Sequence, residues 1–591
     1  MPFLLAAALS AGQLLAQTVT GTITGTVTDP SDQVIAGAKV TLTNDRTGEI
    51  RVVSTNDTGM FSIGALEPGP YSIKVEQGGF KTSRRTGIVL SANERLSAGD
   101  FQLSIGSLSE TVTVEAQAVV VQTASAEHSS VISGSQVDQL QMRGRDPVSL
   151  LKILPGVASF SDSEALGSDY GTGTPTIGGV SNNTNHLAID GVTSNDLGTP
   201  SVFSSPISMD AIGEVKTLLT SYQAEYGGNG GAVVQIVTKS GTQQFHGGAY
   251  WYKRHEMFNA NTFFNNQTGT PKAKYRYITL GGSISGPVYI PGKFNRNKDK
   301  LFFFYNVEDW GTKQPQGLRQ VTMPTALERT GDFSQTVDLN NKMIVIKDPT
   351  NNGTAFTDNK IPANRVIANG QSILNIFPLP NFPNRAISGG NYNYTFQESL
   401  DVPKLSHLFR IDLPVSAVNK FSLRGSHWYS DQGGYACSSC ASNWGLFKQH
   451  YRFAEEGLTF NWVHIFSPTI VNEFNVGVRN NKEKWYPDTD KDLQGFQRAN
   501  RGLSTLGQWY PQDNDLGIIP QASFGGVTGG ASISYDGRGM STIHLIPTLP
   551  IRTRCWGISA AIPNPPRGFT PPRMPGWASG SRKTVGRRAG G

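Results

Sequence analysis

The chain has 591 residues, of which only 16% are charged and 66 are glycines. This length excludes a mini-protein and allows several domains, and the abundant Gly, Thr, Asn and Ser favour short strands and turns, so we expect a mainly β fold. The net charge of +6 comes from the end of the chain, because residues 551–591 hold seven Arg, one Lys and no acidic residue and leave the preceding part at −2. The charge therefore gives no indication of a nucleic-acid partner.

The first 17 residues, MPFLLAAALSAGQLLAQ, form an apolar run with small residues and a cleavage position after Ala16, typical of a secretory signal peptide. The basic residues that usually precede such a run are missing, since the first one is Lys39, so the true start codon could lie upstream. An apolar N-terminal strand is the alternative. No later stretch has the eighteen or so consecutive apolar residues of a transmembrane helix, so a membrane-spanning chain would have to be a β-barrel.

Residues 18–106 alternate apolar and polar side chains between turn signals such as Asp29-Pro30 and Pro68-Gly69. This pattern predicts a small β-sandwich. The residues expected to face inward are Val27, Val40, Leu42, Phe61, Ile63, Tyr71, Ile73 and Val75. The order of the Gly, Asp and Pro motifs resembles the carboxypeptidase regulatory-like domain, a prealbumin-like sandwich. A zinc carboxypeptidase needs an H-x-x-E pair, and none of the nine His has Glu three residues on, so we expect a binding or spacer module and no enzyme.

Residues 107–243 contain shorter apolar segments, each closed by Gly or Pro. A capped helix is predicted near Ser135, with Asp138 at the third position beyond it. The motifs that follow are Leu154-Pro155-Gly156-Val157, Ile177-Gly178-Gly179, Ile189-Asp190-Gly191-Val192, Ile212-x-Glu214-Val215, Glu225-Tyr226-Gly227 and Ile236-Val237-Thr238-Lys239. Their order resembles the plug domain of TonB-dependent outer-membrane receptors, with Gly178-Gly179 in place of the family's Arg-Gly. The resemblance implies site residues at Pro155, Gly156, Ile189, Asp190, Gly191, Tyr226 and Gly227.

Residues 244–550 supply seven segments in which apolar and polar side chains alternate. In the last of them Ile470, Phe474, Val476 and Val478 share one face, and Asn475, Gly477 and Arg479 share the other. This lipid-out, polar-in pattern predicts strands of an outer-membrane β-barrel, with Trp251, Tyr252, Trp310, Trp428 and Trp462 available for the aromatic girdles. Short and long connections alternate, and we expect residues 313–405 to be one long loop. A soluble β-sandwich is the alternative for these strands taken alone.

The stretch Glu110-Thr111-Val112-Thr113-Val114 lies between the sandwich and the plug, where a receptor of this family carries its TonB box. Such a box pairs with TonB by strand addition, and β-branched residues favour the extended form. The alternative is that these residues form the last strand of the sandwich or the first strand of the plug.

As a whole, residues 18–545 resemble the Oar-like TonB-dependent receptors, which implies the outer membrane of a Gram-negative bacterium with the N-terminal domain and plug on the periplasmic side. The implied partners are TonB with its inner-membrane energising complex, outer-membrane lipid and a small extracellular ligand of the siderophore, carbohydrate or peptide class. We expect no cofactor, no metal and no catalytic residue. Cys437 and Cys440 could form a loop disulfide or remain thiols, since a zinc site would need a second ligand pair.

The predicted barrel is incomplete. The family barrel has about 22 strands, whereas the sequence shows seven clear strands and then residues 551–591, a basic Pro/Arg/Gly-rich tail expected to be out of frame or disordered. An open barrel would leave unpaired strand edges in lipid, so we expect a truncated receptor that does not insert stably. The alternatives are a cell-surface carbohydrate-binding or adhesion protein, or an inactive fragment.

Overall fold

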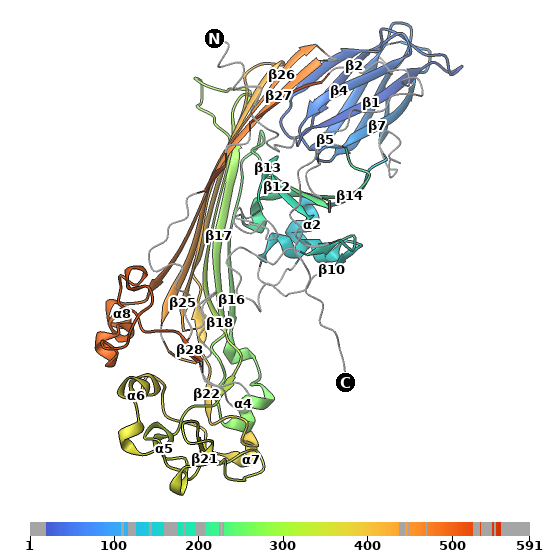
Figure 1. Ribbon diagram of the computed structural model, residues 1–591. Coiled ribbons are helices and arrows are strands. Elements are labelled where there is room, and N and C mark those ends of the chain that lie inside the picture. Colours follow the sequence, from blue (N-terminus) through green and yellow to red (C-terminus); the bar gives the residue numbers. More distant parts are fainter. Residues whose placement is uncertain are drawn as a thin grey trace, which may run out of the picture.

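The computed structural model describes residues 19–107, 111–115, 126–140, 145–158, 175–180, 184–195, 207–223, 226, 230–435, 444–446, 448–467, 470–523, 532–533, 546–548 and 551–556. Strands dominate these residues, which confirms the predicted mainly β class. Figure 1 shows an N-terminal sandwich, a small mixed domain and a tall curved sheet that ends in a region of short helices. No helix in the described ranges combines the length and apolar character needed to cross a membrane.

The N-terminal domain is the predicted sandwich. One sheet has the order β4-β1-β7 and the other β3-β2-β5-β6-β8. The strands are β1 (Gly21–Thr28), β2 (Lys39–Asn44), β3 (Ile50–Ser54), β4 (Met60–Leu66), β5 (Gly69–Glu76), β6 (Thr82–Leu90), β7 (Arg95–Gln102) and β8 (Thr111–Glu115). All eight side chains predicted to face inward are at most 3% exposed, because the period-two pattern turns every second residue toward the facing sheet.

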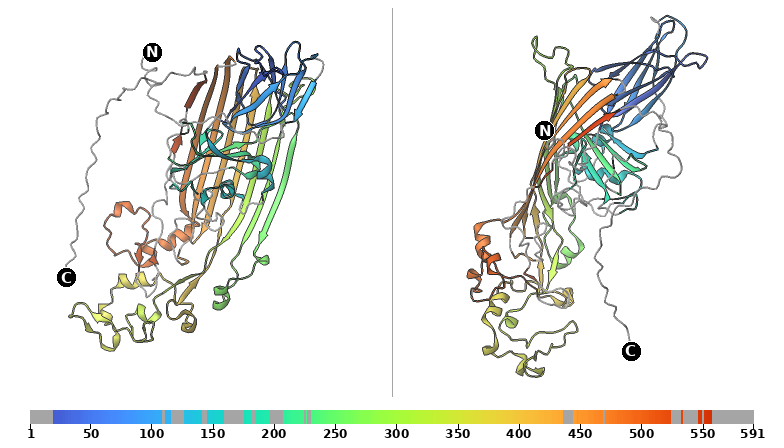
Figure 2. Two further views of the ribbon diagram at one scale, coloured as in Figure 1. Left: turned by 90° about the vertical axis from the view of Figure 1, so that its right-hand side faces the viewer. Right: turned by 45° about the horizontal axis from the view of Figure 1, so that its top comes forward.

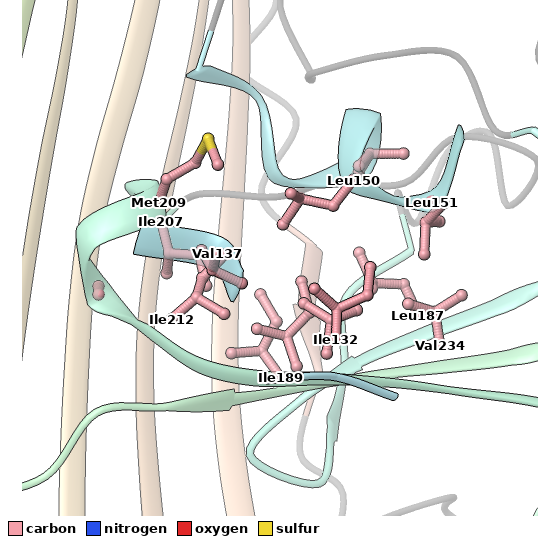
Figure 3. Close-up of a cluster of buried hydrophobic side chains, with 14 of the residues drawn as sticks. Ile132, Val137, Leu150, Leu151, Leu187, Ile189, Ile207, Met209, Ile212 and Val234 are labelled. Atoms are coloured by element: carbon pink, nitrogen blue, oxygen red, sulfur yellow. The ribbon is translucent and has the colours of Figure 1, made fainter. Parts of the chain in front are cut away.

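The plug domain contains a five-stranded sheet of order β13-β12-β15-β14-β9. Its elements are β9 (His128–Ser133), α2 (Gly134–Gln139), η2 (Pro147–Ile153), β10 (Val157–Ala158), β11 (Thr176–Ile177), β12 (His186–Ile189), β13 (Val192–Thr193), η4 (Met209–Ala211), β14 (Ile212–Thr220) and β15 (Val233–Thr238). Figure 3 shows the core between this sheet and the short helices, where Leu150 and Leu151 lie over Leu187 and Val234. The core is completed by Phe304 and Leu408 of the large sheet, so the plug is packed against it.

The predicted helix of the plug begins at a different cap. The N-cap of α2 is Ser133, two residues before the predicted position at Ser135. Ser133 forms a capping box with Gln136. Asp138 is not the capping partner, because it lies two residues beyond the N3 position; its carboxylate instead accepts a hydrogen bond from Lys239 Nζ at 2.8 Å. The capping pattern was therefore displaced by two residues, within the usual error of helix boundaries.

The large sheet is antiparallel and contains all seven predicted strands. They are β16 (His246–His255), β17 (Arg276–Pro287), β18 (Phe302–Pro315), β24 (Lys404–Pro414), β25 (Asn419–Gly434), β26 (Gln449–Ser467) and β27 (Ile470–Pro487). Three short strands, β23 (Ser399–Asp401), β30 (Ile546–Thr548) and β31 (Ile551–Trp556), complete the ten-stranded sheet. Among the described strands, β16 stands at one end of the order, and β30 and β31 pair with β27 at the other.

The two faces of this sheet differ as predicted. Cross-strand pairs such as Leu458 with Val478 and Trp462 with Phe474 form an apolar row on the outer face, which suits contact with lipid. Trp310 and Trp428 were expected in the aromatic girdles, and this is wrong. Both are at most 9% exposed, because their strand positions place them on the inner face, where Trp428 packs with Phe453.

The segment 313–405, predicted as one loop, is folded. It contains β19 (Arg319–Val321), α5 (Ala326–Arg329), β20 (Lys347–Asp348), β21 (Thr354–Ala355), η7 (Thr357–Asn359), η8 (Ala363–Arg365), α6 (Ala368–Leu374), α7 (Arg385–Ser388) and β22 (Tyr394–Phe396). Together with residues 444–446 and the segment 488–519, which includes α8 (Asp490–Phe496), η9 (Ala499–Arg501) and η10 (Pro511–Asp513), residues 316–398 form what we call the cap. The cap has its own core, formed by Val321, Met323, Ile376, Phe377, Trp444, Phe496, Leu503, Ile518 and Ile519.

The parts are arranged along the long strands. The N-terminal domain lies at the end where β26 turns into β27, and the cap lies at the opposite end (Figures 1 and 2). The plug lies against the inner face between them (Figure 2).

Candidate functional site

The motif Ile189-Asp190-Gly191-Val192 forms the tight turn between β12 and β13. Both central residues have positive φ, 46° at Asp190 and 79° at Gly191, as the two-residue turn of a hairpin requires, and Asp-Gly is a preferred pair there. The Asp190 carboxylate accepts hydrogen bonds from Thr238 N–H at 2.9 Å and from the Thr238 hydroxyl at 2.7 Å. The turn is thus tied to the end of β15 inside the plug.

The same carboxylate connects the plug to the large sheet. Asp190 lies 3.1 Å from Arg424 Nε and 3.8 Å from Arg410 Nη1, and all three side chains are about one-tenth exposed. Asn475 Nδ2 donates to the Asp190 carbonyl at 3.3 Å. Gly477 permits this close approach, because a Cβ at its position would lie 2.6 Å from a Val192 methyl group.

A neighbouring ion pair extends this contact. Arg479 donates to both carboxylate oxygens of Glu455, at 3.1 and 2.7 Å, and to the carbonyls of Thr193 and Asn195. The Arg479 guanidinium therefore links two strands of the sheet to the backbone of the plug after β13. Charge-assisted hydrogen bonds of this kind are stronger than neutral ones.

A second charged contact between the plug and the large sheet joins Arg145 to Asp210 of η4 and Glu308 of β18. Arg145 of the plug donates to Glu308 at 3.0 Å through both Nε and Nη2 and also pairs with Asp210. Its guanidinium lies over the Tyr250 ring, 4.7 Å from the centroid. Glu308 is completely buried, so its carboxylate is paired with Arg145 of the plug instead of being hydrated by water.

The other plug residues predicted from the resemblance have structural positions. Pro155 and Gly156 form the turn from η2 to β10, and Gly178 N–H donates to the Gly156 carbonyl at 2.9 Å. Tyr226 is buried against Leu218 and Val233. Gly227 lies outside the described residues.

The predicted TonB box is placed as a strand of the N-terminal domain. Thr111, Val112, Thr113 and Val114 fall in β8, which pairs in parallel with β6. Glu110 lies outside the described residues. β8 is the last strand of its sheet. This position does not test whether the segment is a TonB box, so that role stays a prediction.

The loop between β6 and β7 contacts the plug. Ala92 N–H donates to Glu214 Oε1 at 2.8 Å, and Asn93 donates to Gln235. Burial raises the pKa of Glu214 to about 7, and the hydrogen bond from Ala92 opposes this shift. Glu214 therefore changes its charge in the neutral range while it holds the N-terminal domain on β14.

A cavity of about 540 Å³ lies beside the cap, between the β16–β17 connection and the ends of β18 and β23. Among the described residues that line it, none carries a carboxylate and Lys272 is the only charged one. Its walls carry six side-chain amides, from Asn259, Asn261, Asn265, Gln316, Gln320 and Gln397, together with Phe264 and Tyr275. Such a volume and such a mixture of aromatic and amide groups suit a small polar ligand.

No group of three His, Cys, Asp or Glu side chains is placed to hold a metal ion within the part of the chain that the structure describes. Cys437 and Cys440 lie outside that part, so their pairing stays a prediction.

The sequence analysis missed most of the charged partners of the plug. Arg410, Arg424 and Glu308 had no motif around them. They occupy inner-face positions of predicted strands, as Arg479 does, so a charge on the polar face of an alternating strand was the available signal. Glu455, the partner of Arg479, lies in β26 before the alternating segment that begins at Gly457.

Three family models match consecutive parts of the chain. They are the carboxypeptidase regulatory-like domain at residues 22–104, the TonB-dependent receptor plug domain at 122–234 and the outer membrane beta barrel domain at 237–546. The barrel model alone covers more than half of the chain.

Among curated proteins, the chain is similar to the TonB-dependent transporter Oar of Myxococcus xanthus, with 26% identity over 295 residues that make up 46% of this chain and 25% of that protein. Similar solved structures include the outer membrane transporter YddB from Escherichia coli, with a TM-score of 0.39, 10% identity and coverage of 61% of this chain and 40% of that one. The FrpB iron transporter from Neisseria meningitidis gives a TM-score of 0.34 at 11% identity, with coverage of 67% and 54%. The chain thus spans about a quarter of the length of the curated relative it matches.

Proposed function

Because the chain belongs to the family of TonB-dependent outer-membrane receptors of Gram-negative bacteria, we propose that the receptor in its intact form serves the active uptake of a small extracellular ligand, with TonB as the energising partner. The observation that carries this proposal is the plug on the polar face of the barrel wall, where Asp190 pairs with Arg424 and Arg410. A domain held against the wall by ion pairs, hydrogen bonds and a small apolar contact can be shifted by a pull and can return.

We further propose that TonB pairs with Thr111–Glu115, which comes shortly before the matched plug. Val112→Pro should abolish binding of the periplasmic domain of TonB to the full chain, because proline removes a backbone N–H and fixes φ in the paired strand. Val112→Thr is the matched control, since it keeps a β-branched residue and the backbone donor. Binding that survives Val112→Pro would contradict the assignment.

The ligand class that we propose is neutral and rich in hydroxyl groups, such as an oligosaccharide. Six amides and two aromatic rings line the cavity beside the cap, and none of its described lining residues offers a carboxylate to a cation. Uptake should be compared for a labelled oligosaccharide, a ferric siderophore and a short peptide, with and without a protonophore. Protonophore-sensitive uptake of the siderophore alone would contradict the proposed class and leave the proposed transport intact.

A further inference from the structure

We propose that TonB adds its strand to the open side of β8 while β8 stays paired with β6, so that the N-terminal domain is the platform on which TonB docks. This inference rests on the proposed function, because it takes Thr111–Glu115 to be the TonB box. In this docking mode TonB binds a box that is part of a folded sheet. The box is neither a free peptide nor a strand that must first separate from β6.

The pairing of β8 provides the first argument. Thr111 to Glu115 oppose Thr82 to Thr86 in one continuous parallel register with no shift. β8 is the last strand of the sheet order β3-β2-β5-β6-β8, so one side of β8 faces no other strand among those described. Backbone N–H and C=O groups on that side are available to a sixth strand.

The chemistry of this edge provides the second argument. Natural proteins protect edge strands with charged side chains, proline or a bulge. Thr111–Glu115 contains no proline and no bulge, and its one charged residue, Glu115, stands at the end of the strand. The side chains of Thr111, Val112 and Thr113 are exposed, with Val112 at 45%. An extended, β-branched edge with no charge in its centre is suited to a strand from another chain.

Pre-organisation provides the third argument. A disordered segment loses backbone entropy when it pairs with a partner, and this loss weakens binding. In β8 the segment is already extended by its pairing with β6. TonB would therefore bind a strand whose conformation was fixed when the domain folded.

The place of β8 in the chain, next to the plug, indicates TonB as the protein whose strand pairs with it. β8 precedes the matched plug at residues 122–234, and β6 leads directly into the loop whose Ala92 N–H binds Glu214 of the plug. A strand added to β8 is thus joined to the plug by two routes, residues 116–125 and the β6–β7 loop.

A disulfide across β6 and β8 tests the proposal in the full chain. Arg84 and Thr113 are opposite each other and both exposed, so Arg84→Cys with Thr113→Cys can be cross-linked without a change to the core. Cys437, Cys440 and Cys555 are replaced by Ser in this background. Lys39→Cys with Ser54→Cys, opposite each other at β2 and β3 on the far edge, is the matched control.

Binding of the periplasmic domain of TonB is measured for the oxidised and reduced forms. We expect the two affinities to agree within about twofold, and Val112→Pro to abolish binding in both. A loss of about tenfold or more on oxidation, reversed by reductant and absent in the control pair, would show that TonB displaces β8 and would overturn the docking mode. Binding to the oxidised form that survives Val112→Pro would also overturn it, and failure of the unsubstituted chain to bind TonB would instead contradict the proposed function itself.

Discussion

At the scale of single residues, the Asp190 carboxylate joins the plug to two strands of the barrel wall, β24 and β25. It accepts from Thr238 in the plug and pairs with Arg424 and Arg410 in the barrel wall. Asp suits this position for its charge and also for the turn, because Asp, like Asn, tolerates the left-handed conformation better than most residues. The charge and the turn can be separated by substitution with Asn.

Asp190→Asn should keep the turn and lose the ion pairs. Since removal of one partner leaves buried guanidinium groups without compensation, we expect local stability at the plug–barrel contact to fall by about 3 kcal/mol. Hydrogen exchange of the β12 and β15 amides should therefore accelerate by about a hundredfold. Asp138→Asn is the control, because the Asp138–Lys239 pair is largely exposed and should change exchange little. Equal effects of the two substitutions would contradict the role of Asp190.

The raised pKa of Glu214 predicts a pH dependence. Because burial raises this pKa from 4.5 to about 7, Glu214 is neutral in the folded chain at pH values where it would be ionised in the unfolded chain. Stability is therefore greatest below about pH 4.5 and falls as the pH rises through about 7, by about 3 kcal/mol in total. Glu214→Gln keeps an acceptor for Ala92 N–H and should remove this dependence in unfolding measurements from pH 4 to 8. A parallel decline in both proteins would assign the dependence to another group.

One part of the Asp190 contact was predictable from the sequence and another was not. The Asp190-Gly191 turn was predictable, since its conformation follows from local backbone preferences. The partners Arg410 and Arg424 were not, because they lie more than 200 positions away and only the curvature of the sheet brings them to the plug. Period-two alternation assigns a residue to a face but not to a contact.

At the scale of elements, the alternating strands were the most predictable part. All seven long strands formed where apolar and polar residues alternate, because one face meets the plug and the other is apolar. The cap was missed for a related reason. Its core draws Val321, Phe377, Trp444 and Phe496 from three connections, and none of these segments has enough apolar residues of its own to signal a fold.

Substitution of a residue in the cap core should unfold the cap and leave the barrel strands folded. Phe377 is 2% exposed and its ring lies 5.3 Å from that of Trp444, so Phe377→Ala should cost about 3–5 kcal/mol within the cap. Limited proteolysis should then cut the cap, while the long strands stay resistant. Leu379→Ala is the control, because Leu379 is 55% exposed in the same segment. Resistance of the Phe377 variant equal to that of the control would show that the cap core is not cooperative.

At the scale of the whole molecule, the N-terminal domain is held by the barrel wall as well as by the plug. Lys420 of β25 pairs with Glu49, and Ala65 packs with Val463, Ile465 and Val471 at the turn from β26 to β27. This arrangement was not predictable from the sequence. Domain order along the chain says nothing about which surfaces meet, and the contact uses isolated charges and one small apolar cluster rather than a motif.

Reversal of one charge at this interface should undock the domain. Lys420→Glu places two carboxylates together where one pair was largely buried, and juxtaposed like charges weaken such contacts by about 2 kcal/mol or more. Hydrogen exchange in β4, which carries Ala65, should accelerate in this variant, while the sandwich core stays protected. Since Glu49→Lys in the same chain restores opposite charges, the double variant should recover most of the protection. Recovery identifies electrostatic docking as the cause. If β4 exchange is unchanged in both variants, the apolar contact of Ala65 and not the ion pair holds the domain on the barrel wall, and a pull on β8 would then reach the barrel rim through packing.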